Sequence, residues 1–280
     1  MRTGTLILGA TSVGIAYALS HEDCVIVEKG MNLCVDYTDC MNIQPVSLAA
    51  LPAYTPETRE IYRRAKEKNI IGANGSLHPF PLIGITAAAL LEKEVPVLSF
   101  CEAVRMERQE TGFAVQLYCV SGYMEISARR IIDATPGGNA AFAAAFGAQA
   151  CDADVKRAIA ASVRGKGVSG GFAIPAARNG IHGIGDARMI KGCFDDEYYL
   201  ELSVAPCDGY PTALESLHRL WQGLAADPSY AGFEFIDAAA ELIVKTAGFS
   251  FTEAAPDAYR LIPATQKDFF FNFSHAETCE

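Results

Sequence analysis

The chain has 280 residues, of which 50% are hydrophobic and 20% charged, and its formal net charge at pH 7 is −10. This composition predicts a well-buried globular protein rather than a disordered one. An acidic surface repels the phosphate backbone of nucleic acids and gives no attraction to anionic membranes, so we expect neither as a partner. No segment approaches the roughly 18 uninterrupted apolar residues of a membrane span.

The nine cysteines indicate a reducing compartment. Their number is odd, and Cys24, Cys101 and Cys119 lie in runs with the pattern of buried strands, which is typical of free thiols in a cytoplasmic protein. No Cys-x-x-Cys pair or Cys/His cluster predicts a metal site. The apolar stretch at residues 5–19 is similar to a signal peptide, but two glycines interrupt it, and we expect a cytoplasmic location.

The first thirty residues predict a βαβ unit. Residues 5–8 form a short apolar run that ends at Gly9, and residues 12–19 carry apolar side chains at helical spacing. Residues 24–27 form a second apolar run, which ends at Glu28. Apolar runs of this length are typical of parallel strands buried on both faces. Strand, glycine turn, helix, strand and acidic residue follow one another as in the mononucleotide-binding half of a doubly wound sheet.

The middle of the chain predicts two helices and an antiparallel meander. Thr55 and Pro56 form a helix start, because Thr caps a helix and Pro suits its first turn. We expect this helix to extend to about residue 68 and a second helix to cover residues 86–92. Alternating apolar and polar residues then predict strands exposed on one side. These strands cover residues 95–100, 102–107, 113–120, 123–126 and 129–134.

The pattern changes after about residue 152. Strands are predicted around residues 170–174, 180–185 and 198–204, and helices at 211–224 and 236–247. We therefore predict an α/β protein with a Rossmann-like dinucleotide-binding domain at residues 1–150. Residues 151–280 are expected to form an α+β substrate or cap domain with its own sheet. Whether the chain returns to the first domain near its C-terminus stays open.

Residues 9–14, Gly-Ala-Thr-Ser-Val-Gly, match most of the dinucleotide fingerprint G-x-G-x-x-G. In that motif the first glycine makes a tight turn, the second lets the pyrophosphate approach the backbone, and the third lets helix and strand pack closely. Thr11 stands at the second position, so the motif by itself also fits a purely structural βαβ unit. Glu28 follows Gly9 by nineteen residues, where a carboxylate can accept hydrogen bonds from both ribose hydroxyls. Together these residues predict a nucleotide site.

Three stretches resemble the FAD-dependent oxidoreductases of the glutathione-reductase-like, two-dinucleotide-binding fold, of which the chain looks like a short and divergent member. Residues 6–29 are similar to the ADP-binding βαβ unit of that family, and residues 88–104 to the helix and strand before its meander. Residues 130–135 are similar to the strand that ends in the family's Ala-Thr-Gly turn. The resemblance covers residues 1–150, about half of the chain, and implies that they form a Rossmann-like FAD/NAD(P)-binding domain of the three-layer ββα type.

The resemblance implies that the matched positions bind FAD. The turn and the helix start would lie against the pyrophosphate, because free N–H groups and the helix dipole favour anions there. These positions are Gly9, Thr11, Ser12, Val13 and Gly14. Glu28 would bind the adenosine ribose, with Lys29 near the adenine. Val104 would offer its backbone to the adenine edge, and Thr135 would close the pocket.

Three departures from the family pattern leave the strength of FAD binding open. Thr11 replaces the second glycine, and Pro136 replaces the glycine of the Ala-Thr-Gly turn. The family's late Gly-Asp motif, which binds the ribityl-pyrophosphate part of FAD, has one candidate here, Gly185-Asp186. Ninety-four residues follow it, and a turn in the second sheet is the better interpretation.

Other side chains suggest chemistry less strongly. Disulfide reductases of this superfamily carry a Cys-x4-Cys pair after the ribose-binding acid, but five residues separate Cys34 from Cys40, and two ordinary thiols are the simpler interpretation. His78 lies in a loop that could approach a flavin or be solvated, and His182 is expected to be packed. The four phenylalanines within residues 269–273 predict either a core segment or a surface for a partner.

These observations favour a flavoprotein: an FAD-dependent oxidoreductase that acts by flavin hydride transfer on a small-molecule substrate held by residues 150–280. The catalytic residues are not identified. A second hypothesis is a non-catalytic or incomplete subunit that needs a partner chain or a homo-oligomer, as Thr11 and Pro136 suggest. A third is an NAD-binding protein that uses Gly9 and Glu28.

Overall fold

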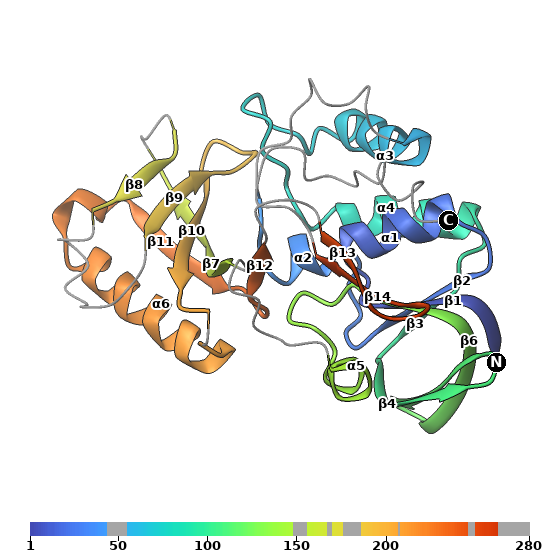
Figure 1. The fold of residues 1–280 in the computed structure, drawn as a ribbon. Helices are drawn as coiled ribbons and strands as arrows, with labels where there is room; N and C mark the ends of the chain where they lie inside the picture. Colours follow the sequence, from blue (N-terminus) through green and yellow to red (C-terminus); the bar gives the residue numbers. More distant parts are fainter. Residues whose placement is uncertain are drawn as a thin grey trace.

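The computed structural model describes residues 1–43, 55–147, 156–166, 170–175, 186–206, 208–245 and 250–262. These residues form two sheets with helices packed on them (Figure 1). Among the described residues, none of the helices has the length and apolar character needed to cross a membrane. The arrangement confirms the predicted α/β class with a second sheet.

The first sheet has eight strands and is parallel at its centre. Its main path is β13-β14-β6-β1-β2-β3, and β4 and β5 continue from β6 as an antiparallel meander. The strand bounds are β1 Arg2–Leu8, β2 Cys24–Glu28, β3 Val97–Ser99, β4 Cys101–Gln109, β5 Gly112–Cys119, β6 Gly122–Asp133, β13 Ser250–Ala255 and β14 Ala258–Ile262. Because β1 pairs in parallel with both β2 and β6, the carboxyl ends of these three strands meet at one edge.

The parallel strands are covered on both faces, which gives three layers. One face packs on α1 (Ser12–Ser20), α3 (Pro56–Glu67) and α4 (Leu82–Glu92), which Figure 1 shows on one side of the sheet. The other face packs on the meander and α5 (Ala140–Phe146). Side chains of β1 alternate between the layers: Ile7 belongs to the helix side, and Leu6 and Leu8 to the meander side. The uninterrupted apolar run of β1 follows from this double burial.

The second sheet is antiparallel and lies beside the first (Figure 1). Its order is β11-β7-β10-β9-β8, and β12 also pairs with β7. The bounds are β7 Lys156–Gly165, β8 Phe172–Ile174, β9 Ala187–Lys191, β10 Glu197–Val204, β11 Phe233–Ala238 and β12 Ile243–Lys245. Helix α6 (Tyr210–Ala225) covers one face, and its apolar residues at helical spacing, Ala213, Leu217, Leu220 and Leu224, are all buried.

Several predicted elements are confirmed by the structure. Helix α3 begins where expected, because the Thr55 hydroxyl accepts a hydrogen bond from the Thr58 N–H at 3.3 Å. The helices predicted at 86–92 and 211–224 correspond to α4 and α6. The meander is present, but the strands predicted at 123–126 and 129–134 are one strand, β6, with no turn between them. The strand predicted at residues 180–185 lies outside the described residues.

The helix predicted at residues 236–247 is wrong. This segment contains the end of β11 and the whole of β12, both of which pair with β7. Between them the Ala239 N–H donates to the Ala160 carbonyl at 2.8 Å, and the Ala240 N–H donates to the Asp39 carbonyl at 2.7 Å. These bonds to other segments replace the local bonds of a helix. The apolar face predicted for this helix is also not fully buried, since the Ile236 residue is 47% exposed.

Replacement of Gly14 in α1 by alanine tests how closely α1 and β1 pack. A Cβ atom at Gly14 would lie 2.7 Å from the Gly9 carbonyl oxygen, so Gly14→Ala should destabilise the protein by about 1–3 kcal/mol in urea unfolding. Gly84→Ala in α4 is the matched control, because a Cβ atom there would have no other atom within 4 Å. Alanine at this position should be neutral or stabilise by up to about 1 kcal/mol. Equal effects at both positions would contradict the packing argument.

Candidate functional site

The turn between β1 and α1 needs glycine at its first position. Gly9 has a backbone φ angle of +91°, which residues other than glycine rarely adopt. A Cβ atom on Gly9 would also lie 2.9 Å from the Cα atom of Thr135, the second residue after β6. The absence of a side chain therefore lets the ends of β1 and β6 approach each other at the edge of the sheet.

Thr11 has a structural role at the place where the fingerprint has its second glycine. Its side-chain oxygen accepts a hydrogen bond from the Gly14 N–H at 3.2 Å, and Thr11 is thus the N-cap of α1. It is 1% exposed, and Ser12 and Val13 beside it are at most 2% exposed. The start of α1 is therefore enclosed by the protein in this structure.

Glu28 fixes the other side of the turn. Its Oε2 atom accepts from the Ala10 N–H and its Oε1 atom from the Gly30 N–H, both at 2.8 Å. Burial raises the pKa of this carboxyl, and the two N–H bonds oppose that rise. The carboxylate holds the glycine turn and the end of β2 together.

Asp36 is a site residue that the sequence analysis missed. It lies in α2 (Val35–Thr38), and its Oδ1 atom accepts from the Ser12 N–H at 2.7 Å. The Ser12 hydroxyl donates to its Oδ2 atom. Burial raises the pKa of Asp36 to about 6, although both bonds from Ser12 oppose the rise. An acidic residue in the loop after Glu28 was the only signal in the sequence, and nothing local connects it to α1.

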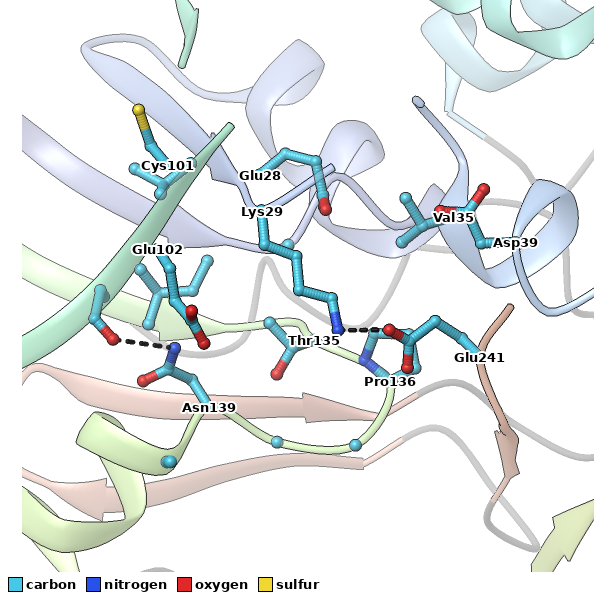
Figure 2. A pocket seen from close by; sticks show the side chains of 17 residues that line it. Glu28, Lys29, Val35, Asp39, Cys101, Glu102, Thr135, Pro136, Asn139 and Glu241 are labelled. Carbon is cyan, nitrogen blue, oxygen red and sulfur yellow. Dashed lines mark hydrogen bonds and ion pairs between the residues drawn. The ribbon is translucent and has the colours of Figure 1, made fainter. Parts of the chain in front are cut away.

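A cavity of about 170 Å³ opens at the carboxyl ends of β1, β2 and β6 (Figure 2). Of the residues predicted to bind the cofactor, four line it: Gly9, Glu28, Lys29 and Thr135. Pro136, the residue in place of the family's glycine, also lines it. The residues of the helix start, 11–14, do not. Val104 lies on β4 and is 43% exposed, and its neighbour Ala103 lines the cavity instead.

The lining of the cavity is acidic. Glu28, Asp39, Glu102 and Glu241 contribute carboxylates, and Lys29 is the one basic residue of the described lining. The Lys29 ammonium forms an ion pair with Glu241, and Figure 2 shows the two side chains pointing toward each other. Glu241 comes from the segment between β11 and β12, so the second sheet contributes to the rim.

The cavity fits the adenosine half of a dinucleotide better than the diphosphate half. Each oxygen of Glu28 accepts one N–H and retains a lone pair for a ribose hydroxyl. At the start of α1, however, the Ser12 N–H already donates to Asp36, and the Gly14 N–H donates to Thr11. A diphosphate fits there only after the Asp36 side chain moves away.

The remaining candidates of the sequence analysis have other surroundings. The thiols of Cys34 and Cys40 are buried and have different partners, Thr86 at 3.8 Å and the Leu242 carbonyl at 3.2 Å. Burial raises the pKa of Cys34 well above its usual range, which is opposite to the shift of a reactive thiol. His78 Nδ1 lies 2.6 Å from Glu197 Oε1.

Three predicted features lie outside the described residues: His182, the aromatic segment at 269–273, and Gly185 of the Gly-Asp pair. Asp186 is described, and its carbonyl accepts from the Ser203 N–H in the second sheet. Among the described residues, no group of three His, Cys, Asp or Glu side chains is arranged to hold a metal ion.

The comparisons with known proteins show the fold. No family model and no curated protein sequence matches the chain. Among solved structures, CmlS, a flavin-dependent halogenase, matches with a TM-score of 0.63 at 12% identity, over 99% of this chain and 56% of that one. OxyS anhydrotetracycline hydroxylase from Streptomyces rimosus matches with a TM-score of 0.61 at 13% identity, over 97% of this chain and 59% of the hydroxylase chain.

A third similar structure is aklavinone-11 hydroxylase in a ternary complex with FAD and aklavinone. It matches with a TM-score of 0.60 at 11% identity, over 98% of this chain and 60% of that one. The chain has the Rossmann-like α/β fold of these structures. It spans about 60% of the length of these flavin enzymes.

Asp36→Asn should change how the stability of the protein depends on pH. The folded-state pKa of about 6 lies above the ordinary 3.8, so the folded protein binds this proton more tightly than the unfolded chain. That stabilisation is complete below about pH 4 and is lost as the pH rises through about 6. Relative to Asp36→Asn, the wild type should lose about 2 kcal/mol of unfolding free energy from pH 4 to pH 7. Urea unfolding at several pH values measures this difference, and parallel profiles would contradict it.

Proposed function

We propose that this chain is an FAD-dependent oxidoreductase that acts on a small-molecule substrate by flavin hydride transfer. The observation that carries the proposal is the cavity at the carboxyl ends of β1, β2 and β6, where Glu28 and Gly9 lie together. Ligands of open α/β sheets bind outside the carboxyl ends of the strands. The similar flavin-dependent hydroxylases and halogenase support FAD as the ligand, in keeping with the resemblance to glutathione-reductase-like oxidoreductases in residues 1–150.

In this proposal the cavity holds the adenosine end of FAD. Glu28 accepts the ribose hydroxyls, and the residues at the end of β6 from Thr135 to Gly138 form the opposite wall. The volume of about 170 Å³ is below the roughly 300–1,000 Å³ of pockets that enclose a whole drug-sized ligand. It is therefore too small to enclose the whole cofactor, most of which extends beyond it in this proposal.

A bound flavin supplies the redox chemistry, and the protein supplies binding and orientation. The second sheet lies beside the first, and Glu241 reaches the cavity rim from it. We assign the small-molecule substrate to the side of the molecule formed by this sheet. A cytoplasmic location remains part of the proposal.

A second candidate function is a flavoprotein-like subunit that needs a partner chain, or another copy of itself, to bind the cofactor fully. One observation favours it: the Asp36 carboxylate occupies the start of α1. An NAD-binding protein that uses the same Glu28 is the third candidate.

The visible absorption spectrum of the purified protein tests the proposal. We expect the two bands of oxidised flavin, either as purified or after addition of FAD. A colourless protein that takes up flavin only with a co-expressed partner would favour the second candidate. Binding of NAD without any binding of FAD would contradict both.

Glu28→Gln tests the ribose contact. Loss of the charged acceptor should weaken FAD binding by about 10- to 100-fold, because hydrogen bonds to charged groups contribute about 1.5–3 kcal/mol. Glu107→Gln, at an exposed acid on β4, is the control and should leave the affinity unchanged. Fluorescence titration with FAD measures both, with circular dichroism to confirm folding. Equal affinities of the two variants would exclude Glu28 as the ribose ligand.

A further inference from the structure

The start of α1 already carries an anion that belongs to the chain itself. Asp36 Oδ1 lies 2.7 Å from the Ser12 nitrogen, and Asp36 Oδ2 accepts the Ser12 hydroxyl. Asp36 is 5% exposed and Ser12 is fully buried. The bonds therefore lie inside the protein, where they are not weakened by competition with water.

The position of this carboxylate is the one that a diphosphate needs. The first N–H groups of a helix have no partner within the helix, and together with the helix dipole they attract an anion. At α1 two of them are already engaged, Ser12 with Asp36 and Gly14 with the N-cap Thr11. Just before the helix, the Ala10 N–H donates to Glu28.

The protein holds Asp36 in this place through several contacts. Cys34, the residue before α2, has a left-handed backbone with φ of 55°, which turns the chain so that α2 faces α1. The Val35 N–H then donates to the Ala10 carbonyl at 3.3 Å. At the end of α2, the Asp39 carbonyl accepts the N–H groups of Ala240 and Glu241 from the second sheet. Contacts at the start and at the end of α2 thus hold the Asp36 carboxylate in position against Ser12.

We infer that Asp36 determines which nucleotides this site accepts, because its carboxylate occupies the place of the diphosphate. The inference rests on the proposed nucleotide site and deepens it. Adenosine, which carries no phosphate, needs only the cavity beside Glu28 and does not meet Asp36. A ligand with a diphosphate must displace Asp36 from Ser12 and accept a hydrogen bond from the same N–H group. The displaced Asp36 carboxylate then remains as a second negative charge near the diphosphate. Because Asp36 occupies the start of α1, ligands that contain ADP bind more weakly relative to adenosine.

The ratio of two dissociation constants measures this selectivity. Calorimetric titration of the full chain with adenosine and with ADP gives the ratio for each variant, independently of how tightly the cavity binds a nucleoside. In the wild type, ADP should bind no more tightly than adenosine. In Asp36→Ala the start of α1 is open, and the preference should shift toward ADP by at least about tenfold, equivalent to 1.4 kcal/mol.

Two further variants separate the causes of such a shift. Asp36→Asn keeps the size of the side chain and an acceptor for the Ser12 N–H but removes the charge, so its ratio should lie between those of the wild type and Asp36→Ala. It also protects the test if Asp36→Ala does not fold. Asp23→Asn removes one negative charge at the opposite end of β2, where Asp23 pairs with Arg129, and should leave the ratio unchanged.

The results distinguish the inference from the function on which it rests. If adenosine binds and the ratio is the same in the wild type and both Asp36 variants, the inference is overturned and the nucleotide site stands. If the ratio shifts equally in Asp23→Asn, the effect is one of total charge and the inference is again overturned. If no variant binds adenosine or ADP, the nucleotide site itself is wrong, and the role of Asp36 falls with it.

Discussion

The buried carboxylate of Glu28 is the constraint on which the candidate site depends. It joins the end of β2 to the glycine turn through the N–H groups of Gly30 and Ala10. With the turn fixed in this way, α1 starts directly over the edge of the sheet, and Gly9 packs against Thr135 at the end of β6. The wall of the cavity, the direction of α1 and the approach of β6 all follow from these contacts. Burial raises the pKa of the same carboxyl, so the arrangement holds a charge that the interior disfavours.

The second constraint is the connection of the two sheets through the segment that contains α2. Cys40, Met41 and Ile43 are buried in one apolar cluster with Tyr199 and Ile243 of the second sheet. The same segment carries Asp36, which reaches α1, and Asp39, whose carbonyl binds the chain between β11 and β12. A structural change where the two sheets meet is therefore expected to be transmitted to the start of α1 through only a few residues. This links the side of the molecule assigned to the substrate with the side assigned to the cofactor.

The first half of the chain was predictable because its signals are local. Apolar runs, a glycine turn and a capped helix each act within a few residues, and β1, α1, β2 and α3 follow the predicted pattern. The second half was less predictable because its strands depend on β7, which was not predicted at all. Residues 236–247 have a helical pattern of apolar side chains, yet pairing with β7 places residues 236–238 and 243–245 in strands. Long-range hydrogen bonds decided the structure there.

For the candidate site, the sequence alone determined Gly9, Gly14 and Glu28, since a tight turn, a close helix and a carboxylate at the end of a strand each have a fixed position along the chain. The tertiary structure decided the rest. It showed that Thr11 caps α1, that Glu241 pairs with Lys29 across the cavity, and that Asp36 bonds to Ser12. Asp36 lies twenty-four residues after Ser12 along the chain, and Glu241 lies two hundred and twelve residues after Lys29. Contacts of this kind depend on how sheets and helices pack, which no local pattern of side chains encodes.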